Sequence, residues 1–204
     1  MDAALRLAEL MAARLCHDLS GPVGTLAGVL DGAGGDPAAL QLAEETAGQL
    51  SRRLRLLRAA WAADAPGLSV AELRALAAGL ANRRAAVDFS GVADGADFEP
   101  GSARVVANVL LLAGECLPGG GTVALTGAAD GDLVAVISGP RATWPAGFAA
   151  MLVDEAASWA ALTDARTMQA PLTVLLARAA GIRISLLMGA GAGPPPLLMA
   201  LGGK

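Results

Sequence analysis

The only histidine of the chain, His17, is followed at once by the carboxylate of Asp18 and five residues later by Pro22. Imidazole is a nucleophile and a proton carrier near neutral pH. A single imidazole cannot build a histidine-rich metal centre, and any Ser-His-Asp triad would have to use His17. A proline inside a helix costs about 3 kcal/mol. Its presence beside a histidine and an acid favours a functional site over a packing role.

These residues lie in the first of two stretches where apolar residues recur alternately every three and four positions. This spacing predicts two long helices over about residues 5–31 and 37–61, each about 40 Å long. The segment DGAGGDP (31–37) separates them, with glycines to end the first helix, Asp36 to cap the second and Pro37 in its first turn. The apolar positions are Leu5, Ala8, Ala12, Leu15, Leu19, Pro22, Leu26 and Val29, then Leu40, Ala43, Ala47, Leu50, Leu54, Leu57 and Trp61.

His17 does not belong to this apolar stripe. It lies two residues from both Leu15 and Leu19, about 200° around the helix from each. We therefore expect its ring to face solvent. The alternative is a surface histidine without a role.

Two helices alone cannot bury both apolar stripes. A two-fold dimer that closes a four-helix bundle would bury them, and we favour this arrangement. Cover by the rest of the chain is the alternative.

The remainder of the chain predicts an α+β fold in which helices cover one face of a mixed sheet. Ser69 and Glu72 form a capping box that opens a helix to about residue 81. Further helices are expected over 102–117, 146–161 and 170–180. Strands are expected over 86–89, 122–128, 133–138, 182–188 and 197–201.

The residues His17, Asp18 and Pro22 resemble the phosphoacceptor box of histidine kinases, and LCHDLSGPVG (15–24) resembles that of ChpT-type histidine phosphotransferases of alphaproteobacteria. Residues 67–204 resemble the α/β sandwich of the kinase ATP-binding domain. The resemblance implies a phosphotransfer and dimerisation domain over residues 1–65, followed by a degenerate kinase-like domain over residues 66–204.

The kinase-like half departs from its family at three motifs. Leu112 stands where the resemblance places a magnesium-binding Asn, and Ser138 stands where it places an adenine-reading Asp. Residues 167–171 lack the glycines of a phosphate-binding lid. A leucine cannot coordinate a cation that requires oxygen ligands. We therefore expect no ATP binding and no cofactor, and an exposed or helix-capping role for Asn108.

The resemblance implies a relay in which His17 takes a phosphoryl group from the receiver aspartate of a hybrid sensor kinase and passes it to a response regulator. Magnesium is then expected on the partner receiver. Three alternatives stay open: a dimeric adaptor with an inert histidine, an authentic histidine kinase, and a receiver phosphatase.

Several neighbours of His17 are candidates for supporting roles. Asp18 could orient or deprotonate the imidazole, contact a partner, or be a solvated helix charge. If the turn centres on residues 33–34, residue 50 lies level with His17. Arg14, Arg52 and Arg53 then form a basic patch for an acidic receiver. Ser20, Gly21 and Gly24 would let that receiver approach closely.

Composition limits the other classes of function. Aromatic residues make up 3% of the 204 residues, Tyr is absent and the net charge is −4. These values argue against a nucleic-acid partner. Two cysteines cannot build a disulfide framework, and no secretory signal is visible. The uncharged run 184–201 is interrupted by glycines and prolines, so it is not expected to cross a membrane. We expect a cytoplasmic protein.

Overall fold

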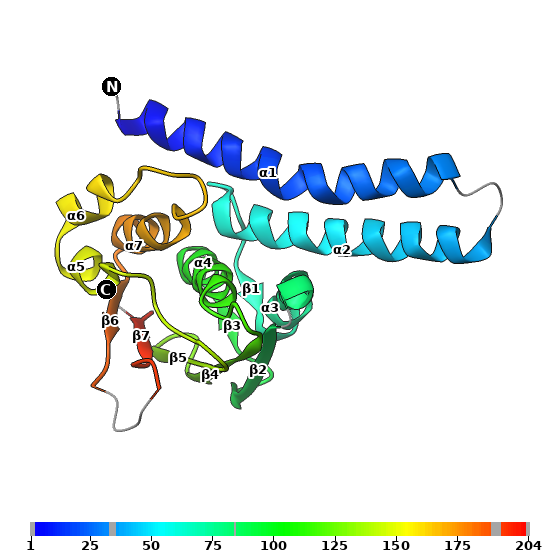
Figure 1. Cartoon of the computed structure of the whole chain (residues 1–204). Coiled ribbons are helices and arrows are strands. Elements are labelled where there is room, and N and C mark those ends of the chain that lie inside the picture. Colours follow the sequence, from blue (N-terminus) through cyan, green and yellow to red (C-terminus); the bar gives the residue numbers. More distant parts are fainter. Residues whose placement is uncertain (1–2, 33–35, 84, 189–192, 203–204) are drawn as a thin grey trace.

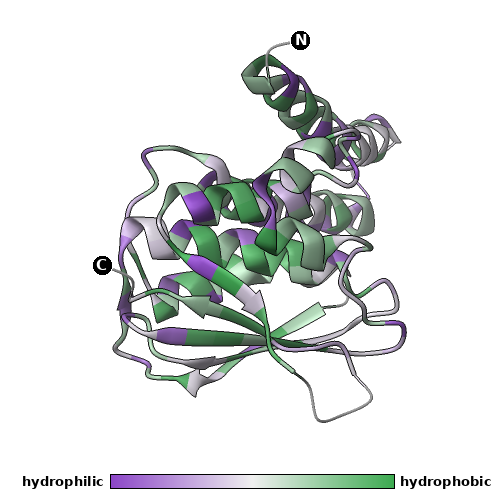
Figure 2. Ribbon diagram, turned by 90° about the vertical axis from the view of Figure 1, so that its left-hand side faces the viewer, coloured by the Kyte–Doolittle hydropathy of each residue, from purple (hydrophilic) through white to green (hydrophobic). Residues whose placement is uncertain are grey.

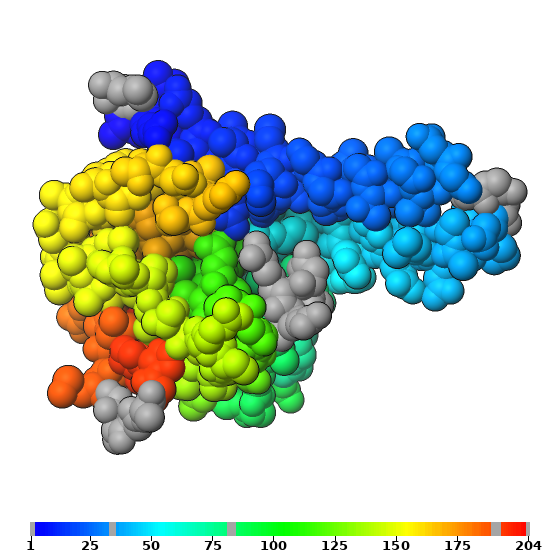
Figure 3. Space-filling model, viewed as in Figure 1, coloured from blue at the N-terminus to red at the C-terminus, as the bar shows by residue number. Residues whose placement is uncertain are grey.

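Two long helices and a mixed sheet form the computed structural model of the chain, which describes residues 3–32, 36–83, 85–188 and 193–202. Helices α1 (Ala3–Gly32) and α2 (Pro37–Trp61) lie side by side and extend beyond the remaining elements (Figures 1 and 3). We call this helix pair the arm and residues 68–202 the body. The predicted boundary at residue 65 falls in the segment that joins them.

The start of α2 follows from its capping residues. Asp36 accepts a hydrogen bond from the backbone N–H of Ala38 at 3.0 Å, and Pro37 occupies the first turn. The glycines expected to end α1 include residues 34 and 35, which lie outside the described residues.

Helix α1 continues through Pro22, and Figure 1 shows that it changes direction about midway. Pro22 has no N–H to donate to the carbonyl of Asp18, one turn earlier. Ser20 and Thr25 each donate from the side chain to the carbonyl four residues before, at 2.6 and 3.1 Å. Such bonds also bend helices.

The body covers one half of the arm. Leu10 of α1 packs with Leu162, Met168 and Leu172 in a small buried cluster. In the last turns of α2, Leu56, Leu57 and Ala60 belong to the main core of the body. In this half of the arm, the apolar side chains are therefore covered by the rest of the chain, which was the alternative to cover by a second copy. Large apolar side chains stay exposed elsewhere on the arm: Leu5, Val23, Leu30, Leu40, Leu42 and Leu54.

The body contains a five-stranded sheet of order β2-β4-β5-β7-β6. Strands β2 and β4 are parallel and the other neighbours antiparallel. Helices lie over one face of the sheet, as Figure 2 shows. The predicted α+β fold with a mixed sheet is confirmed. The strands are β2 (Ala85–Val92), β4 (Gly121–Gly127), β5 (Asp132–Ser138), β6 (Arg183–Leu186) and β7 (Leu197–Ala200). The main helices are α3 (Val70–Ala77), α4 (Pro100–Glu115) and α7 (Gln169–Ala179).

Three local features differ from the prediction. The helix expected over 146–161 is two helices, α5 (Phe148–Val153) and α6 (Glu155–Ala160), because the Asp154 side chain caps a new helix through the N–H of Ala156. The helix after Ser69 ends at Ala77 and continues as the 3-10 helix η1 (Ala78–Arg83). Strands β1 (Leu68–Ser69) and β3 (Asp97–Phe98) were not expected, since two residues carry no periodicity.

Within the described residues, no helix has both the length and the apolar character needed to cross a bilayer. The uncharged run 184–201 contains β6 and β7, and its residues 189–192 lie outside the described part.

Candidate functional site

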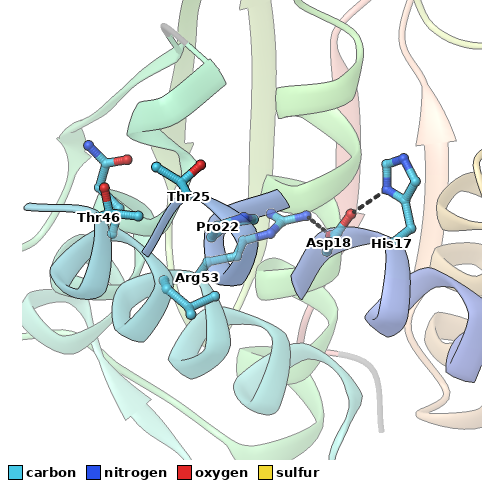
Figure 4. Close-up of a pocket in the computed structure, with 8 residues that line it drawn as sticks. His17, Asp18, Pro22, Thr25, Thr46 and Arg53 are labelled. Carbon is cyan, nitrogen blue, oxygen red and sulfur yellow. Dashed lines mark hydrogen bonds and ion pairs between the residues drawn. The ribbon is translucent and has the colours of Figure 1, made fainter. Parts of the chain in front are cut away.

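His17 projects from the middle of α1, and 63% of its side chain is exposed. Its Nδ1 lies 3.3 Å from Oδ1 of Asp18, as Figure 4 shows. An ionised carboxylate can only accept hydrogen bonds, so Nδ1 carries the proton of the neutral ring. This tautomer leaves the lone pair on Nε2, the nitrogen on the far side of the ring from the carboxylate.

Asp18 is buried, with 8% of its side chain exposed, although it follows an exposed residue on the same helix. Its Oδ1 accepts from Nε of Arg14 at 3.1 Å, and its Oδ2 accepts from Nη2 of Arg53 at 2.9 Å. Burial opposes ionisation, but the bond from Arg53 and the charges of both arginines outweigh it and lower the pKa of Asp18. The alternative of a solvated helix charge is therefore wrong.

Arg14 points into the body instead of lying beside His17 on the surface. Its guanidinium is bound by the Glu115 carboxylate of α4 and by the carbonyls of Ala165 and Arg166, at 3.2 and 3.4 Å. Burial works against the charge of Arg14, but the carboxylates of Glu115 and Asp18 raise its pKa above the ordinary value. The expectation of Arg14 as an exposed cation for a partner is corrected, because the loop before α7 covers this face of α1.

Arg53 of α2 reaches across the arm and donates to Asp18, one residue after the histidine. It comes near the site as expected, yet it is only 9% exposed and is engaged by that carboxylate. Arg52 is exposed and lines a different groove, together with Arg55 and Glu72. The structure therefore does not form the expected patch of three surface arginines.

A groove of about 400 Å³ runs between α1 and α2 beside the histidine. Figure 4 shows the Asp18 carboxylate between the His17 ring and the Arg53 guanidinium at this groove. Six of the eight residues that line it have polar side chains, so it can hold a hydrated or charged group. The lining residues are His17, Asp18, Pro22, Thr25, Thr46, Gln49, Leu50 and Arg53.

The small residues after His17 lie on the open surface of α1. Ser20, Gly21 and Gly24 are exposed, and a Cβ atom added at either glycine would meet no atom within 4 Å. These three expected partner-contact residues are accessible. Leu10, two turns before His17 on α1, is by contrast buried against the body.

The kinase-like motifs lie in the body. Leu112 is 1% exposed, whereas Ser138 is exposed at the end of β5. Asn108 was expected to be exposed or helix-capping, which is wrong: it is fully buried and donates to the carbonyl of Ala60 at the end of α2, at 2.6 Å. Its Oδ1 accepts from Gln169 of α7 at 3.0 Å, so this amide joins the arm to two helices of the body.

Sequence reasoning missed Glu115. It is the only acid in α4, a helix whose other charged residue is Arg104. A carboxylate at the end of such an apolar helix could have indicated an ion pair with a basic side chain of another element. The pairing with Arg14 spans 101 residues, so spacing could not reveal it.

Comparison with known proteins bears on this arrangement. The family described as histidine phosphotransferase C-terminal domain matches residues 70–191, more than half of the chain. The chain belongs to this family. A solved structure of a bacterial phosphotransferase is 25% identical and has a TM-score of 0.74. The match covers 98% of this chain and 97% of that one, so it includes the arm. No curated protein matches the chain.

Membership of this family supports a transferase that acts in a phosphorelay. The family match begins at residue 70 and so does not include His17. The assignment of the acceptor residue depends on the geometry of the arm.

Proposed function

We propose that His17 is the phosphoacceptor of a histidine phosphotransferase of the ChpT type. In this proposal it takes the phosphoryl group from the receiver aspartate of a hybrid sensor kinase and passes it to the receiver aspartate of a response regulator. The observation that carries the proposal is the exposed ring of His17, whose Nδ1 is bound by a buried carboxylate. That contact leaves Nε2 free to attack.

The reaction is an in-line exchange between a carboxylate and an imidazole. The Nε2 lone pair forms the N–P bond as the P–O bond to the receiver aspartate breaks, and this aspartate leaves as a carboxylate. The ring retains its Nδ1 proton and becomes cationic. The negative charge of Asp18 stabilises this cation. Loss of the phosphoryl group to a second aspartate reverses the same steps.

We propose that ATP has no part in this reaction. Leu112 supplies no ligand for a cation, and Ser138 supplies no carboxylate for an adenine. Charge on the phosphoryl oxygens would be neutralised within the receiver, by its magnesium ion and lysine. An authentic histidine kinase would instead label His17 from magnesium-ATP alone.

We also propose a cytoplasmic homodimer that closes a four-helix bundle. On the helical wheel, the exposed residues Leu5, Val23 and Leu30 of α1 fall within about 20° of one another. Leu40 and Leu54 of α2 likewise share one stripe. Both stripes lie about 100° or more around their helices from the buried residues Arg14 and Arg53. A second copy would bury them and leave His17 accessible.

The deciding experiment mixes the protein with a phosphorylated receiver labelled with ³²P and follows acid-labile label on this chain. We expect transfer to the native protein and none to the His17→Gln variant, with circular dichroism and molecular mass unchanged. If His17→Gln is labelled as fast as the native protein, the proposal is wrong. If neither protein is labelled yet both bind the receiver, the adaptor alternative is favoured.

A further inference from the structure

We infer that Glu115 and Arg14 are positioning residues through which the body fixes the proton of His17 on Nδ1. The inference rests on the proposed function of His17 and assigns a role in it to the body. The elements involved are far apart in sequence: Glu115 ends α4, Arg14 and Asp18 lie on α1, and Arg53 lies on α2.

The first step is the anchoring of Arg14 by the body. Its Nη2 donates to Oε1 of Glu115 at 2.5 Å, and its Nη1 donates to the carbonyls of Ala165 and Arg166. Only 6% of the Arg14 side chain is exposed. Three acceptors of the body thus hold one planar guanidinium, which can present its remaining Nε–H in one direction only.

The second step is the orientation of Asp18. The Nε–H of Arg14 binds Oδ1, and Arg53 binds Oδ2 from the opposite helix. With each oxygen held by a different arginine, the carboxylate has a single orientation. Adjacent residues on a helix do not normally face each other. The contact between Asp18 and His17 therefore requires a carboxylate that other groups hold in place.

The third step connects this orientation to the imidazole. Oδ1, the oxygen that Arg14 binds, is also the one 3.3 Å from Nδ1 of His17. A change at Glu115 therefore reaches the ring through three hydrogen bonds: Glu115 to Arg14, Arg14 to Asp18, and Asp18 to His17. Charge alternates along this path from Glu115 to Arg14 to Asp18, and the cationic phosphorylated ring would continue the alternation. The body can thus tune the acceptor without binding a nucleotide.

The experiment uses the fact that His17 is the only imidazole of the chain. Its ring nitrogens give unambiguous ¹⁵N resonances, which report at pH 9 which nitrogen carries the proton. We expect a pyridine-like Nε2 in the native protein and a mixture of both tautomers in Glu115→Gln and Arg14→Lys. Phosphorylation of His17 by phosphoramidate, a donor that needs no receiver, should slow about tenfold in both variants.

Matched controls come from the exposed ion pair of Arg74 and Asp94 in the body, which joins side chains that are 50% and 85% exposed. Arg74→Lys and Asp94→Asn make the same chemical changes away from the site. Both controls should retain the native tautomer and the native rate. Glu115→Gln is nearly isosteric at a side chain that is 21% exposed, so it tests the inference even if Arg14→Lys fails to fold.

A folded Glu115→Gln with the native ¹⁵N pattern and native rate would overturn the inference. Failure of the proposed function looks different. In that case His17 would accept no phosphoryl group from receiver or phosphoramidate, while its tautomer would still change in Glu115→Gln.

Discussion

At the residue scale, the decisive feature is a buried carboxylate beside an exposed imidazole. The heptad spacing predicted the direction of His17, since it depends only on one helix. The role of Asp18 stayed open because its neighbours on other elements were unknown. Arg14 and Arg53 were interpreted as surface cations for the same reason: a helical wheel gives a direction but does not show which other element covers it.

The lowered pKa of Asp18 gives a prediction for the dependence of stability on pH. A carboxylate with a pKa below its ordinary value of about 3.9 stabilises the folded state above that pH, and the stabilisation is lost as pH falls through the folded-state pKa. At pH 7, we expect Asp18→Asn to lower the free energy of unfolding by about 3 kcal/mol, because Arg53 loses its buried counter-charge and Arg14 keeps only that of Glu115.

Urea unfolding between pH 7 and pH 3 measures this difference. It should be constant above about pH 5 and shrink below about pH 4 as the native carboxylate gains a proton. A gap between the two proteins that stays the same down to pH 3 would show that Asp18 is not held as the anion.

At the element scale, α1 combines a proline, two exposed glycines and the proposed acceptor His17 within about two turns. The sequence predicted this helix and its neighbour well, because long amphipathic stretches carry a strong signal. It did not predict the contact between Arg53 and Asp18, since the spacing within one helix does not fix which residues meet on the other. Short elements such as α5 and α6 depend on one capping side chain, and the prediction merged them.

The glycines provide a test that separates helix stability from partner docking. A Cβ atom at Gly24 would contact no neighbouring element, and leucine is a better helix former than glycine by about 0.8 kcal/mol. We expect Gly24→Leu to raise the free energy of unfolding by about that amount. Transfer from a phosphorylated receiver should slow about tenfold, because the new side chain occupies the surface on which the receiver would dock.

The control places the same leucine at Gly32, about 12 Å further along the helix and about 22 Å from His17. Gly32→Leu should leave receiver transfer unchanged. Labelling by phosphoramidate should be native in both variants, since the small donor needs no docking surface. Equal receiver rates for Gly24→Leu and the native protein would contradict the proposed docking face.

At the scale of the whole molecule, the body and the arm share one core, although the sequence predicted two domains. That division rested on the family resemblance and on the change of sequence pattern after the two long helices. The burial of Leu56 and Leu57 among residues of the body could not be predicted, because a heptad pattern does not show which element the apolar stripe packs against. The amide of Asn108 reinforces the joint.

The proposed dimer gives a prediction at this scale. Leu40 and Leu54 are 45% and 40% exposed and lie on the same stripe of α2. The double variant Leu40→Glu, Leu54→Glu should halve the molecular mass measured by light scattering, because burial of four carboxylates per dimer is unfavourable. Leu42→Glu, at a leucine that is 48% exposed and about 200° from Leu40, should leave the mass unchanged. A native mass for the double variant would exclude this face as the interface.

The arm is attached to the body at two separate places, through Leu10 of α1 and through the last turns of α2. We expect these two attachments to hold the arm in one position on the body. An enzyme that phosphorylates its own histidine has to bring a nucleotide up to that side chain, and a fixed arm would oppose such a movement. We expect a partner protein to bind a surface that is already ordered. Little conformational entropy would then be lost on binding, and successive partners would exchange rapidly.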